Sequence, residues 1–139
     1  MAEPNREDAA AQTPDQSSVE GRRCGFVAIV GAPNAGKSTL INRLVGAKVA
    51  IVSHKVQTTR VPVRGIAIRG PAQLVFIDTP GIFAPRRRLD RAMVEAATVA
   101  AGEADIVLLL VDAAKGLDDD TRRILDQLSA GSATRILAL

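Results

Sequence analysis

Short apolar runs alternate along this chain with segments in which apolar residues recur every three or four positions. Short apolar or alternating runs between turn signals predict strands. The predicted strands cover residues 26–30, 61–69, 73–77, 106–111 and 135–139. The fourth run is apolar at every position, which indicates a strand buried on both faces. Gly70-Pro71 between the second and third runs predicts an antiparallel hairpin.

Three segments have the periodicity of amphipathic helices. They cover residues 37–45, residues 89–101, and a segment that opens at the acidic triplet 118–120, since acids suit a helix N-terminus. Gly46 directly follows the first helix, as is common at a helix C-terminus. The predicted inward faces consist of Leu40, Ile41, Leu44 and Val45, then Leu89, Ala92, Met93, Ala96 and Val99, then Ile124, Leu125 and Leu128.

The resulting order, β α β β α β α β, predicts an α/β fold with helices on both faces of a mostly parallel sheet and one antiparallel edge hairpin. Hydrophobic residues make up 47% of the 139 residues and aromatic residues 2%, so the core must consist of Val, Ile, Leu and Ala. Residues 1–22 have no apolar periodicity and predict a disordered tail before a single domain, 23–139. No run is long enough to span a bilayer and no signal peptide is evident, so we expect a soluble intracellular protein.

The net charge of +3 is unevenly distributed. Residues 1–20 contain one Arg and five acids, which leaves a net charge of +7 for the rest. A basic body is compatible with an RNA partner, but a bound nucleotide also requires positive charge. The single Cys24 excludes an internal disulfide and a Cys-based metal site, and we expect it to be a half-buried thiol before the first strand. His54 is expected to be a polar loop residue.

The nine residues GAPNAGKST, from Gly31 to Thr39, lie between the first predicted strand and the first predicted helix. They match the pattern G-x-x-x-x-G-K-[ST], in which backbone N–H groups and the positive end of a helix dipole surround a phosphate. Gly31 and Gly36 permit close approach, Lys37 can reach the β- and γ-phosphates, and the Ser38 hydroxyl can bind Mg²⁺. The alternative, a Gly-rich loop with an incidental Lys, is disfavoured by the flanking strand and helix.

Asp78 closes the apolar strand LVFID, 40 residues after Ser38. A carboxylate at a strand end in a nucleotide site can hold Mg²⁺ through water. The backbone N–H of Gly81 in the following Thr79-Pro80-Gly81 can approach a γ-phosphate, and loss of that phosphate would release the segment. The alternative is a strand-capping Asp followed by a Pro-Gly turn.

Gln57-Thr58-Thr59-Arg60 lies in the long polar segment 47–60. A Thr hydroxyl in such a loop can join Ser38 on the metal, and its backbone N–H can bind the γ-phosphate. We favour Thr59 over Thr58 for this role. Because ligands bind at the carboxyl ends of parallel strands, we expect the phosphate loop, Asp78 and the residues after Val111 to share one edge of the sheet.

The signals GAPNAGKS, TTR and DTPG in this order resemble the translation-factor-related class of P-loop GTPases. GFVAIVGAPNAGKSTLINRLVGAKVAIVSHKVQTTR and FIDTPGIF are similar to the Era-type ribosome-assembly GTPases of the TrmE-Era-EngA-like group, and the likeness covers roughly residues 24–139. It implies a P-loop NTPase fold, metal ligands Ser38, Thr59 and Asp78, and catalytic groups Lys37, Thr59 and Gly81. The nucleotide-binding residues that it implies are Gly31, Ala32, Pro33, Asn34, Ala35, Gly36, Lys37, Ser38, Thr39, Asp78, Thr79, Pro80, Gly81 and Ile82.

The resemblance also implies an activity and partners. It implies binding of GTP and GDP with Mg²⁺, slow GTP hydrolysis, and a switch cycle in assembly of the small ribosomal subunit, with 16S rRNA bound through a KH domain. It implies a monomeric, cytoplasmic protein that associates peripherally with the inner face of the cell membrane. The alternatives are a nucleotide-dependent binding switch without useful catalysis, a related GTPase acting on tRNA modification or large-subunit assembly, and a P-loop ATPase or kinase.

Some residues depart from the family pattern or have two interpretations. Ala35 replaces a frequent Val, and Ile82 stands where some GTPases place a water-orienting Gln. Asn34 resembles a loop Asn that helps hold K⁺ in related GTPases, and a turn residue in the left-handed conformation is at least as good an interpretation. Arg86-Arg87-Arg88 can supply an arginine finger or an rRNA contact, although a solvated basic loop is the commoner meaning of such a run.

No Asn-Lys-x-Asp motif, whose Asp pairs with guanine in that family, occurs in these 139 residues, and no KH domain follows. Guanine specificity is therefore implied by the resemblance alone. We expect the chain to be the N-terminal part of a longer protein. A sheet without its last strand would expose an apolar edge, which predicts poor solubility for these residues alone.

Overall fold

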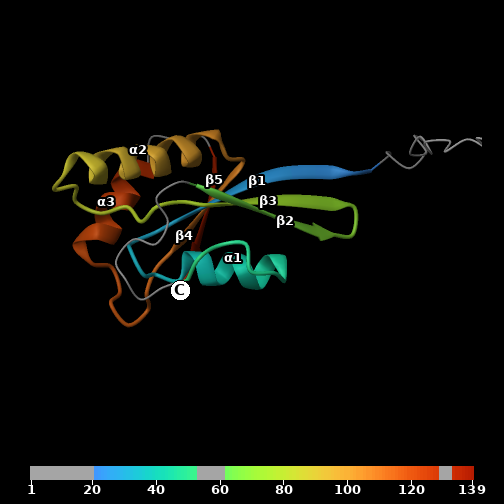
Figure 1. Cartoon of the computed structure of the whole chain (residues 1–139), viewed down its shortest axis with the longest axis horizontal. Helices are drawn as coiled ribbons and strands as arrows, with labels where there is room; N and C mark the ends of the chain where they lie inside the picture. The colour runs from blue at the N-terminus through green and yellow to red at the C-terminus, as the bar shows by residue number, and fades with distance from the viewer. Residues whose placement is uncertain (1–20, 53–61, 129–132) are drawn as a thin grey trace, which may run out of the picture.

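A computed structural model describes residues 21–52, 62–128 and 133–139 as a five-stranded sheet with three helices (Figure 1). The strands lie in the order β2-β3-β1-β4-β5, with β2 antiparallel to β3 and all other neighbours parallel. The predicted order of elements and the edge hairpin are therefore confirmed. The elements are β1 (Arg23–Val30), α1 (Lys37–Val45), β2 (Val63–Arg69), β3 (Ala72–Asp78), α2 (Arg88–Glu103), β4 (Ile106–Leu110), α3 (Asp119–Leu128) and β5 (Thr134–Ala138).

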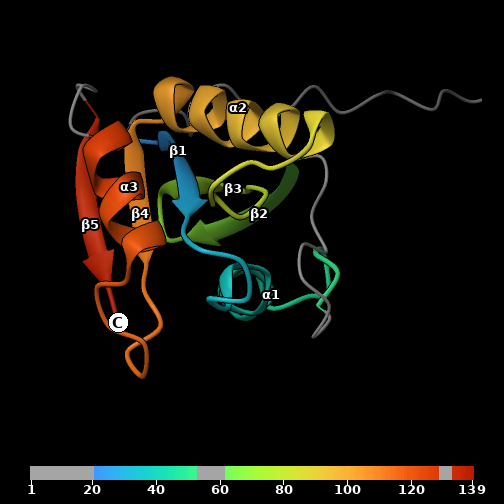
Figure 2. The same cartoon turned by 90° about the vertical axis from the view of Figure 1, so that its left-hand side faces the viewer.

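Helix α1 covers one face of the sheet and helices α2 and α3 cover the other (Figure 2). On the α1 face, the fully buried Ile41 packs among Val27 and Ile29 of β1 and Phe76 of β3. On the opposite face, Ala97 of α2 and Ile124 of α3 pack with residues of β1 and β4. This two-sided burial explains the nearly continuous apolar sequence of the central strands.

Helix α1 begins at Lys37 and ends at Val45, as predicted. Gly46 has a φ of 78° and its backbone N–H donates to the carbonyl of Asn42, so the glycine ends the helix in the left-handed conformation. The predicted apolar face is confirmed: it consists of Leu40, Ile41, Leu44 and Val45, all packed in the core on the α1 face.

The predicted inward face of α2 is wrong at three positions. Leu89 and Val99 are 56% and 53% exposed, and Ala92 is exposed as well. Met93 is buried as predicted and Ala96 is half-buried, and the other buried positions of the helix are Ala97, Ala100 and Ala101. Small side chains let the helix lie close to the sheet, so the larger apolar residues did not mark the packed face.

Three further predictions require correction. Cys24 is exposed and lies within β1, which begins at Arg23 because backbone pairing with β3 extends beyond the apolar run. Leu125 of α3 is 41% exposed, whereas the polar Thr121 is buried next to the N-terminus of that helix. Strand β4 ends at Leu110, and on its α1 face Ile106, Leu108 and Leu110 are only half-buried.

Strand β5 forms an edge of the sheet and exposes apolar side chains. Ile136 and Leu137 are 46% and 57% exposed, as expected for an edge without a further strand. Among the residues that the structure describes, no helix is both long and apolar enough to cross a membrane. Except for Gly21 and Arg22, the predicted N-terminal tail lies outside the described residues, as do His54, Gln57, Thr58, Thr59 and Arg60.

The parallel strands β1, β3 and β4 end at the same edge of the sheet (Figure 1). The register pairs Ile29 of β1 with Asp78 of β3, and Val30 of β1 with Leu109 of β4. The loop after β1 and the segment after β3 therefore emerge side by side, as predicted.

Candidate nucleotide-binding site

The loop from Gly31 to Gly36 connects β1 to α1 and turns tightly against β4. A Cβ atom on Gly31 would lie 2.4 Å from the carbonyl oxygen of Leu110, so only glycine fits at this position. The backbone N–H of Ala35 donates to the carbonyl of Ala32 over 3.3 Å. The packed turn leads directly into the N-terminus of α1, the arrangement in which backbone N–H groups bind a phosphate.

Asn34 stands at the exposed tip of this loop with a φ of 63°, and it is the only non-glycine residue with positive φ in the described part of the chain. Asn tolerates this left-handed conformation better than most residues. The interpretation of Asn34 as a turn residue is therefore confirmed, and a contribution to K⁺ binding stays a prediction.

Lys37 is the first residue of α1, and its side chain folds back over the loop. Its Nζ atom donates to the carbonyl oxygens of Gly31 at 3.2 Å and Ala32 at 2.8 Å, and the residue is only 7% exposed. Burial lowers the pKa of Lys37 to about 8, although the nearby Asp78 carboxylate acts in the opposite direction. The loop thus contains a desolvated cation, which a bound phosphate would stabilise.

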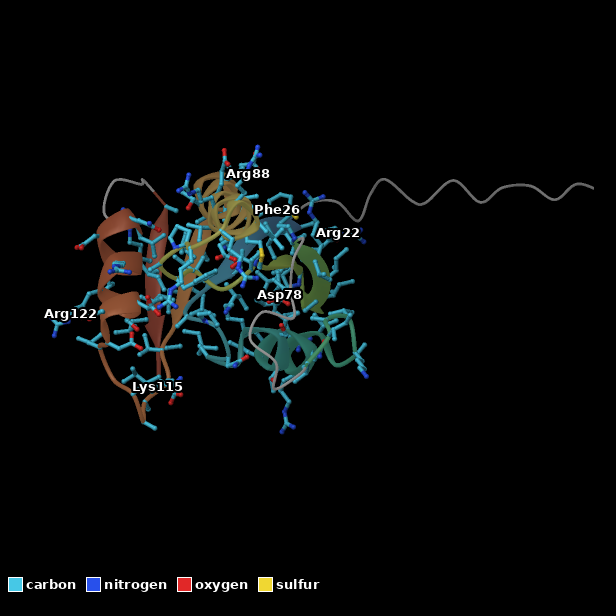
Figure 3. The ribbon with its side chains drawn as sticks, turned by 60° about the vertical axis from the view of Figure 1, so that its left-hand side comes forward. Arg22, Phe26, Asp78, Arg88, Lys115 and Arg122 are labelled. Atoms are coloured by element: carbon cyan, nitrogen blue, oxygen red, sulfur yellow. The ribbon has the colours of Figure 1, made fainter. Side chains whose placement is uncertain are left out.

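Ser38 and Asp78 meet at the base of the loop. The Ser38 hydroxyl donates to Oδ2 of Asp78 over 2.7 Å, and Asp78 is fully buried. Figure 3 labels Asp78 in the interior of the molecule. A hydroxyl and a carboxylate are hard oxygen donors of the type that Mg²⁺ selects, usually together with phosphate oxygens and water. No group of three His, Cys, Asp or Glu residues that could form a different metal site occurs among the described residues. The residues present therefore fit Mg²⁺ bound together with a nucleotide.

The segment after Asp78 packs directly on the phosphate loop. The buried Thr79 hydroxyl donates to the carbonyl of Ile29 over 2.7 Å, and the backbone N–H of Ile82 donates to the carbonyl of Gly31 over 3.0 Å. A Cβ atom on Gly81 would lie 2.8 Å from the backbone nitrogen of Pro33. Residues 78–82 and the loop therefore form one packed unit.

Ile82 does not offer its side chain to the site. It is 2% exposed and belongs to the core cluster that contains Val30, Ala97 and Leu109. An apolar side chain in the core cannot orient a water molecule by hydrogen bonding. The position that holds Gln in some GTPases thus has a packing role here.

Residues 26–139 match the sequence model of a protein family. That family is described as 50S ribosome-binding GTPase. This chain belongs to that family.

Several GTPases are close relatives by sequence. GTPase Era of Rhizobium meliloti (strain 1021) is 55% identical over 139 residues, which cover 100% of this chain and 42% of the relative. GTPase Era of Dinoroseobacter shibae is 64% identical over 107 residues, which cover 77% of this chain and 35% of the relative. The chain thus spans about 40% of the length of the curated relatives that it matches.

Two solved structures of Era have the same fold. One is Era in complex with MgGDPNP and nucleotides 1506–1542 of 16S ribosomal RNA, with a TM-score of 0.79 and 41% identity over 84% of this chain and 40% of that chain. The other is a variant of Aquifex aeolicus Era bound to GDP·AlF4⁻, with a TM-score of 0.77 and 42% identity over 82% of this chain and 39% of that chain.

One contact of this GTPase domain was missed by sequence reasoning. The side chain of Asn42 in α1 accepts hydrogen bonds from the backbone N–H groups of Val49 and Ala50 at 2.9 and 2.8 Å, and donates to the carbonyl of Ala50 at 2.9 Å. These bonds fix the start of the segment that follows α1. Nothing in the sequence pattern distinguishes this Asn from an ordinary helical surface residue.

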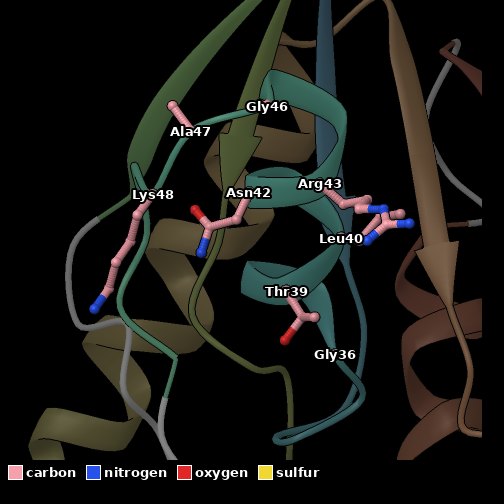
Figure 4. Close-up of a pocket in the computed structure, with 8 residues that line it drawn as sticks. All are labelled: Gly36, Thr39, Leu40, Asn42, Arg43, Gly46, Ala47 and Lys48. Atoms are coloured by element: carbon pink, nitrogen blue, oxygen red, sulfur yellow. The ribbon is translucent and has the colours of Figure 1, made fainter.

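A shallow groove beside α1 includes Asn42 and the exposed Thr39 (Figure 4). Gly36 lies at its phosphate-loop end, and Arg43 and Lys48 also line it. Thr39, which the resemblance assigns to the nucleotide, thus lies on the outer side of α1, near Gly36 at the end of the phosphate loop.

The run Arg86-Arg87-Arg88 lies at the N-terminus of α2 and is exposed. Oδ2 of Asp90 accepts hydrogen bonds from the backbone N–H groups of Arg86 and Arg87 at 3.0 and 2.9 Å, and these bonds cap the helix. Figure 3 shows Arg88 pointing outward. The interpretation as a solvent-exposed basic run is confirmed, and roles as an arginine finger or an rRNA contact stay predictions.

Proposed function

We propose that this chain is the nucleotide-binding part of an Era-like GTPase, which binds GTP and GDP with Mg²⁺ and hydrolyses GTP. The observation that carries the proposal is the hydrogen bond between Ser38 and Asp78 beside the buried ammonium group of Lys37. A hydroxyl, a carboxylate and a cation at one helix N-terminus match the requirements of a magnesium-bound triphosphate. The nucleotides in the Era structures and the family of the chain support guanine as the base.

In this mechanism the chain positions the triphosphate and neutralises its charge. Lys37 would exchange its contacts with Gly31 and Ala32 for phosphate oxygens, and backbone N–H groups of the loop would bind the same anion. Ser38 and Asp78 would hold Mg²⁺, which offsets the charge that develops between the β- and γ-phosphates. The backbone N–H of Gly81 would bind the γ-phosphate. Thr59 would join Ser38 on the metal, an assignment that comes from its place in the polar segment 47–60 and from the resemblance, because Thr59 lies outside the described residues.

Slow hydrolysis follows from the absence of a water-orienting side chain at position 82. Ile82 is held in the core, so water activation requires another group. We propose K⁺ near Asn34 as one source of such assistance, because Asn34 stands at the loop tip. Arg86, Arg87 or Arg88, exposed at the N-terminus of α2, could supply an arginine finger.

The proposed biological role is a nucleotide-controlled step in assembly of the small ribosomal subunit. The support is the Era relative solved with nucleotides 1506–1542 of 16S ribosomal RNA. The rRNA contact would belong to a portion of a longer protein that these 139 residues do not include, such as a KH domain. The proposal includes a monomeric, cytoplasmic protein and peripheral membrane association, both of which come from the resemblance.

A second candidate function is a switch that binds nucleotide and changes partners without useful catalysis. The burial of Ile82 favours it, because this apolar side chain lies in the core and cannot orient a water molecule. Both candidates share the nucleotide site and differ only in whether the bound GTP is hydrolysed.

Binding and single-turnover hydrolysis by the full-length protein test these proposals. We expect a fluorescent GTP analogue to be displaced by GTP and GDP and not by ATP. We expect [γ-³²P]GTP to be hydrolysed slowly, and faster with K⁺ or small ribosomal subunits. If no GTP is hydrolysed under any of these conditions, the binding switch is the only candidate function that remains. Displacement by ATP as effective as displacement by GTP would favour an ATPase or kinase.

A further inference from the structure

A second groove lies between α2 and the β2–β3 side of the sheet, away from the phosphate loop. We call it the α2 groove. Its lining includes Arg64, Ile77, Glu95, Ala96, Val99 and Glu103. Val99 is 53% exposed, so an apolar side chain stands free on the wall of the groove.

Exposed apolar side chains also lie on the sheet beside the α2 groove. The register pairs Arg64 with Ile77, and two residues further along it places Ile66, Val75 and Phe26 in one row across β2, β3 and β1. Ile66 is 54% and Phe26 40% exposed. Val75, which lies between them, is only 6% exposed, whereas Ile68, two residues along β2 from Ile66, is 68% exposed, so Ile66 and Ile68 form the exposed apolar part of this face. Neighbouring exposed apolar side chains of this kind are typical of a protein-binding site.

The charges at the α2 groove favour a protein over a nucleic acid. Glu95 and Glu103 both line it and are exposed, and they lie about 12 Å apart along the helix. Within the described part of the chain, neither glutamate nor Arg64 forms an ion pair. Two exposed carboxylates two turns apart repel phosphate and match Lys or Arg residues at a similar spacing on a partner helix.

Both walls of the α2 groove continue from segments near the nucleotide. Helix α2 begins ten residues after Asp78, and Gly81 in between packs on Pro33 of the phosphate loop. Strand β3 ends in Asp78 itself and pairs along its length with β2. A change of contacts at the γ-phosphate therefore has a short covalent path to each wall.

We propose that the α2 groove binds an amphipathic helix of a small-subunit ribosomal protein, and that it does so when GTP is bound. The helix would bury apolar residues on Val99 and Ile66 and place two basic residues opposite Glu95 and Glu103. The proposal rests on the function proposed above and adds a second contact, with protein, to the contact with 16S rRNA.

Site-specific cross-linking tests the contact. The full-length protein, with p-benzoylphenylalanine in place of Val99, is bound to purified small ribosomal subunits with GDPNP and irradiated. We expect cross-links to a basic helical peptide of one ribosomal protein, several-fold weaker with GDP. A matched probe in place of Leu125 on α3, which is 41% exposed, should give none. Cross-links to rRNA or to a second copy, or no cross-link from subunit-bound protein, would overturn the proposal.

Charge reversal gives an independent test, because a basic protein helix and rRNA predict opposite changes in the affinity for the ribosomal subunit. E95K and E103K should each weaken GDPNP-dependent subunit binding about tenfold if the partner helix is basic, as is usual at an interface hot spot. Each should strengthen binding if the partner is rRNA. V99D should weaken binding and L125D should not.

GDP affinity of each variant reports whether the nucleotide site is folded, and V99S replaces V99D if the latter lacks GDP binding. A cross-link from the probe at position 99, together with no GTP binding by the wild-type protein, would refute the proposed function and leave the contact standing. Normal GTP binding with unchanged subunit binding by E95K, E103K and V99D would refute the contact alone.

Discussion

Gly81 lies so close to Pro33 that a Cβ atom would be 2.8 Å from the backbone nitrogen and 2.9 Å from the Cα atom of that proline. The segment after β3 thus packs on the phosphate loop, backbone against backbone. The contact joins the residues expected to sense the γ-phosphate to the residues expected to hold the β-phosphate.

Gly81→Ala should disturb this contact. The added methyl group meets backbone atoms that cannot rotate away, so we expect a loss of about 1–3 kcal/mol in the free energy of unfolding. GTP affinity should fall more than GDP affinity, because Gly81 is placed at the γ-phosphate. Thermal unfolding and nucleotide titrations measure both effects. G102A is the control: nothing lies within 4 Å of a Cβ atom there, and alanine should stabilise the helix slightly.

Lys37 should make nucleotide binding depend on pH. Its pKa is lowered to about 8 in the free protein, whereas bound phosphate should raise it again. Protein above pH 8 must therefore take up a proton on binding, and GTP affinity should fall up to about tenfold per pH unit there. Lys37→Arg, which stays charged, should remove this pH dependence. A flat affinity profile between pH 7 and 9.5 for the wild type would contradict the assignment.

The same pKa shift predicts how stability depends on pH. The pKa of Lys37 is 10.5 when the chain is unfolded and about 8 when it is folded, so the unfolded chain binds more protons between these values. Stability from this group should therefore rise from pH 8 to pH 10.5, and below pH 8 the buried ammonium should cost about 3 kcal/mol. Lys37→Met should flatten this part of the profile in urea unfolding, and should abolish triphosphate binding without unfolding the domain.

Asp78→Asn should separate metal-dependent from metal-independent binding. The amide cannot replace the carboxylate charge beside Ser38, so GTP affinity with Mg²⁺ should fall by about tenfold or more. Affinity in EDTA should change much less. Isothermal titration in both buffers measures the difference, and D119N on α3 serves as an exposed control. Equal losses in the two buffers would place Asp78 outside the metal's surroundings.

Thr79→Val should weaken the fold rather than the chemistry. The buried Thr79 hydroxyl satisfies the carbonyl of Ile29 over 2.7 Å, and its removal leaves that oxygen without this donor. The expected loss is about 1–3 kcal/mol in the free energy of unfolding. T98V removes a comparable bond to Val94 on the exposed side of α2 and should change stability by less than about 0.5 kcal/mol. Equal effects of the two substitutions would show that burial does not decide the cost.

The sequence predicted best what is determined locally. The bounds of α1 follow from the Gly-Lys-Ser turn at its start and Gly46 at its end, and the hairpin follows from Gly70-Pro71. The Ser38 and Asp78 pair was predictable because the end of a strand and the start of a helix share an edge in this fold.

Features that depend on packing were not predictable in this way. The buried face of α2 consists largely of alanines, which carry little hydrophobic signal in the sequence, and Val99 and Leu89 therefore suggested the wrong face. Cys24 was placed before β1 because strand length there depends on pairing with β3 and not on apolar residues. The hydrogen bonds of Asn42 depend on where the chain returns after Gly46.

The close fit of Gly31 against the Leu110 carbonyl has a consequence for synthesis of the protein. The loop is supported from behind by β4, which follows it by some 75 residues, and from the side by Asp78. A nascent chain that has emerged only as far as α1 has the complete loop sequence but neither support. Nucleotide capture during translation should therefore begin only after β4 leaves the ribosomal exit tunnel, and bound nucleotide would then favour completion of the native sheet.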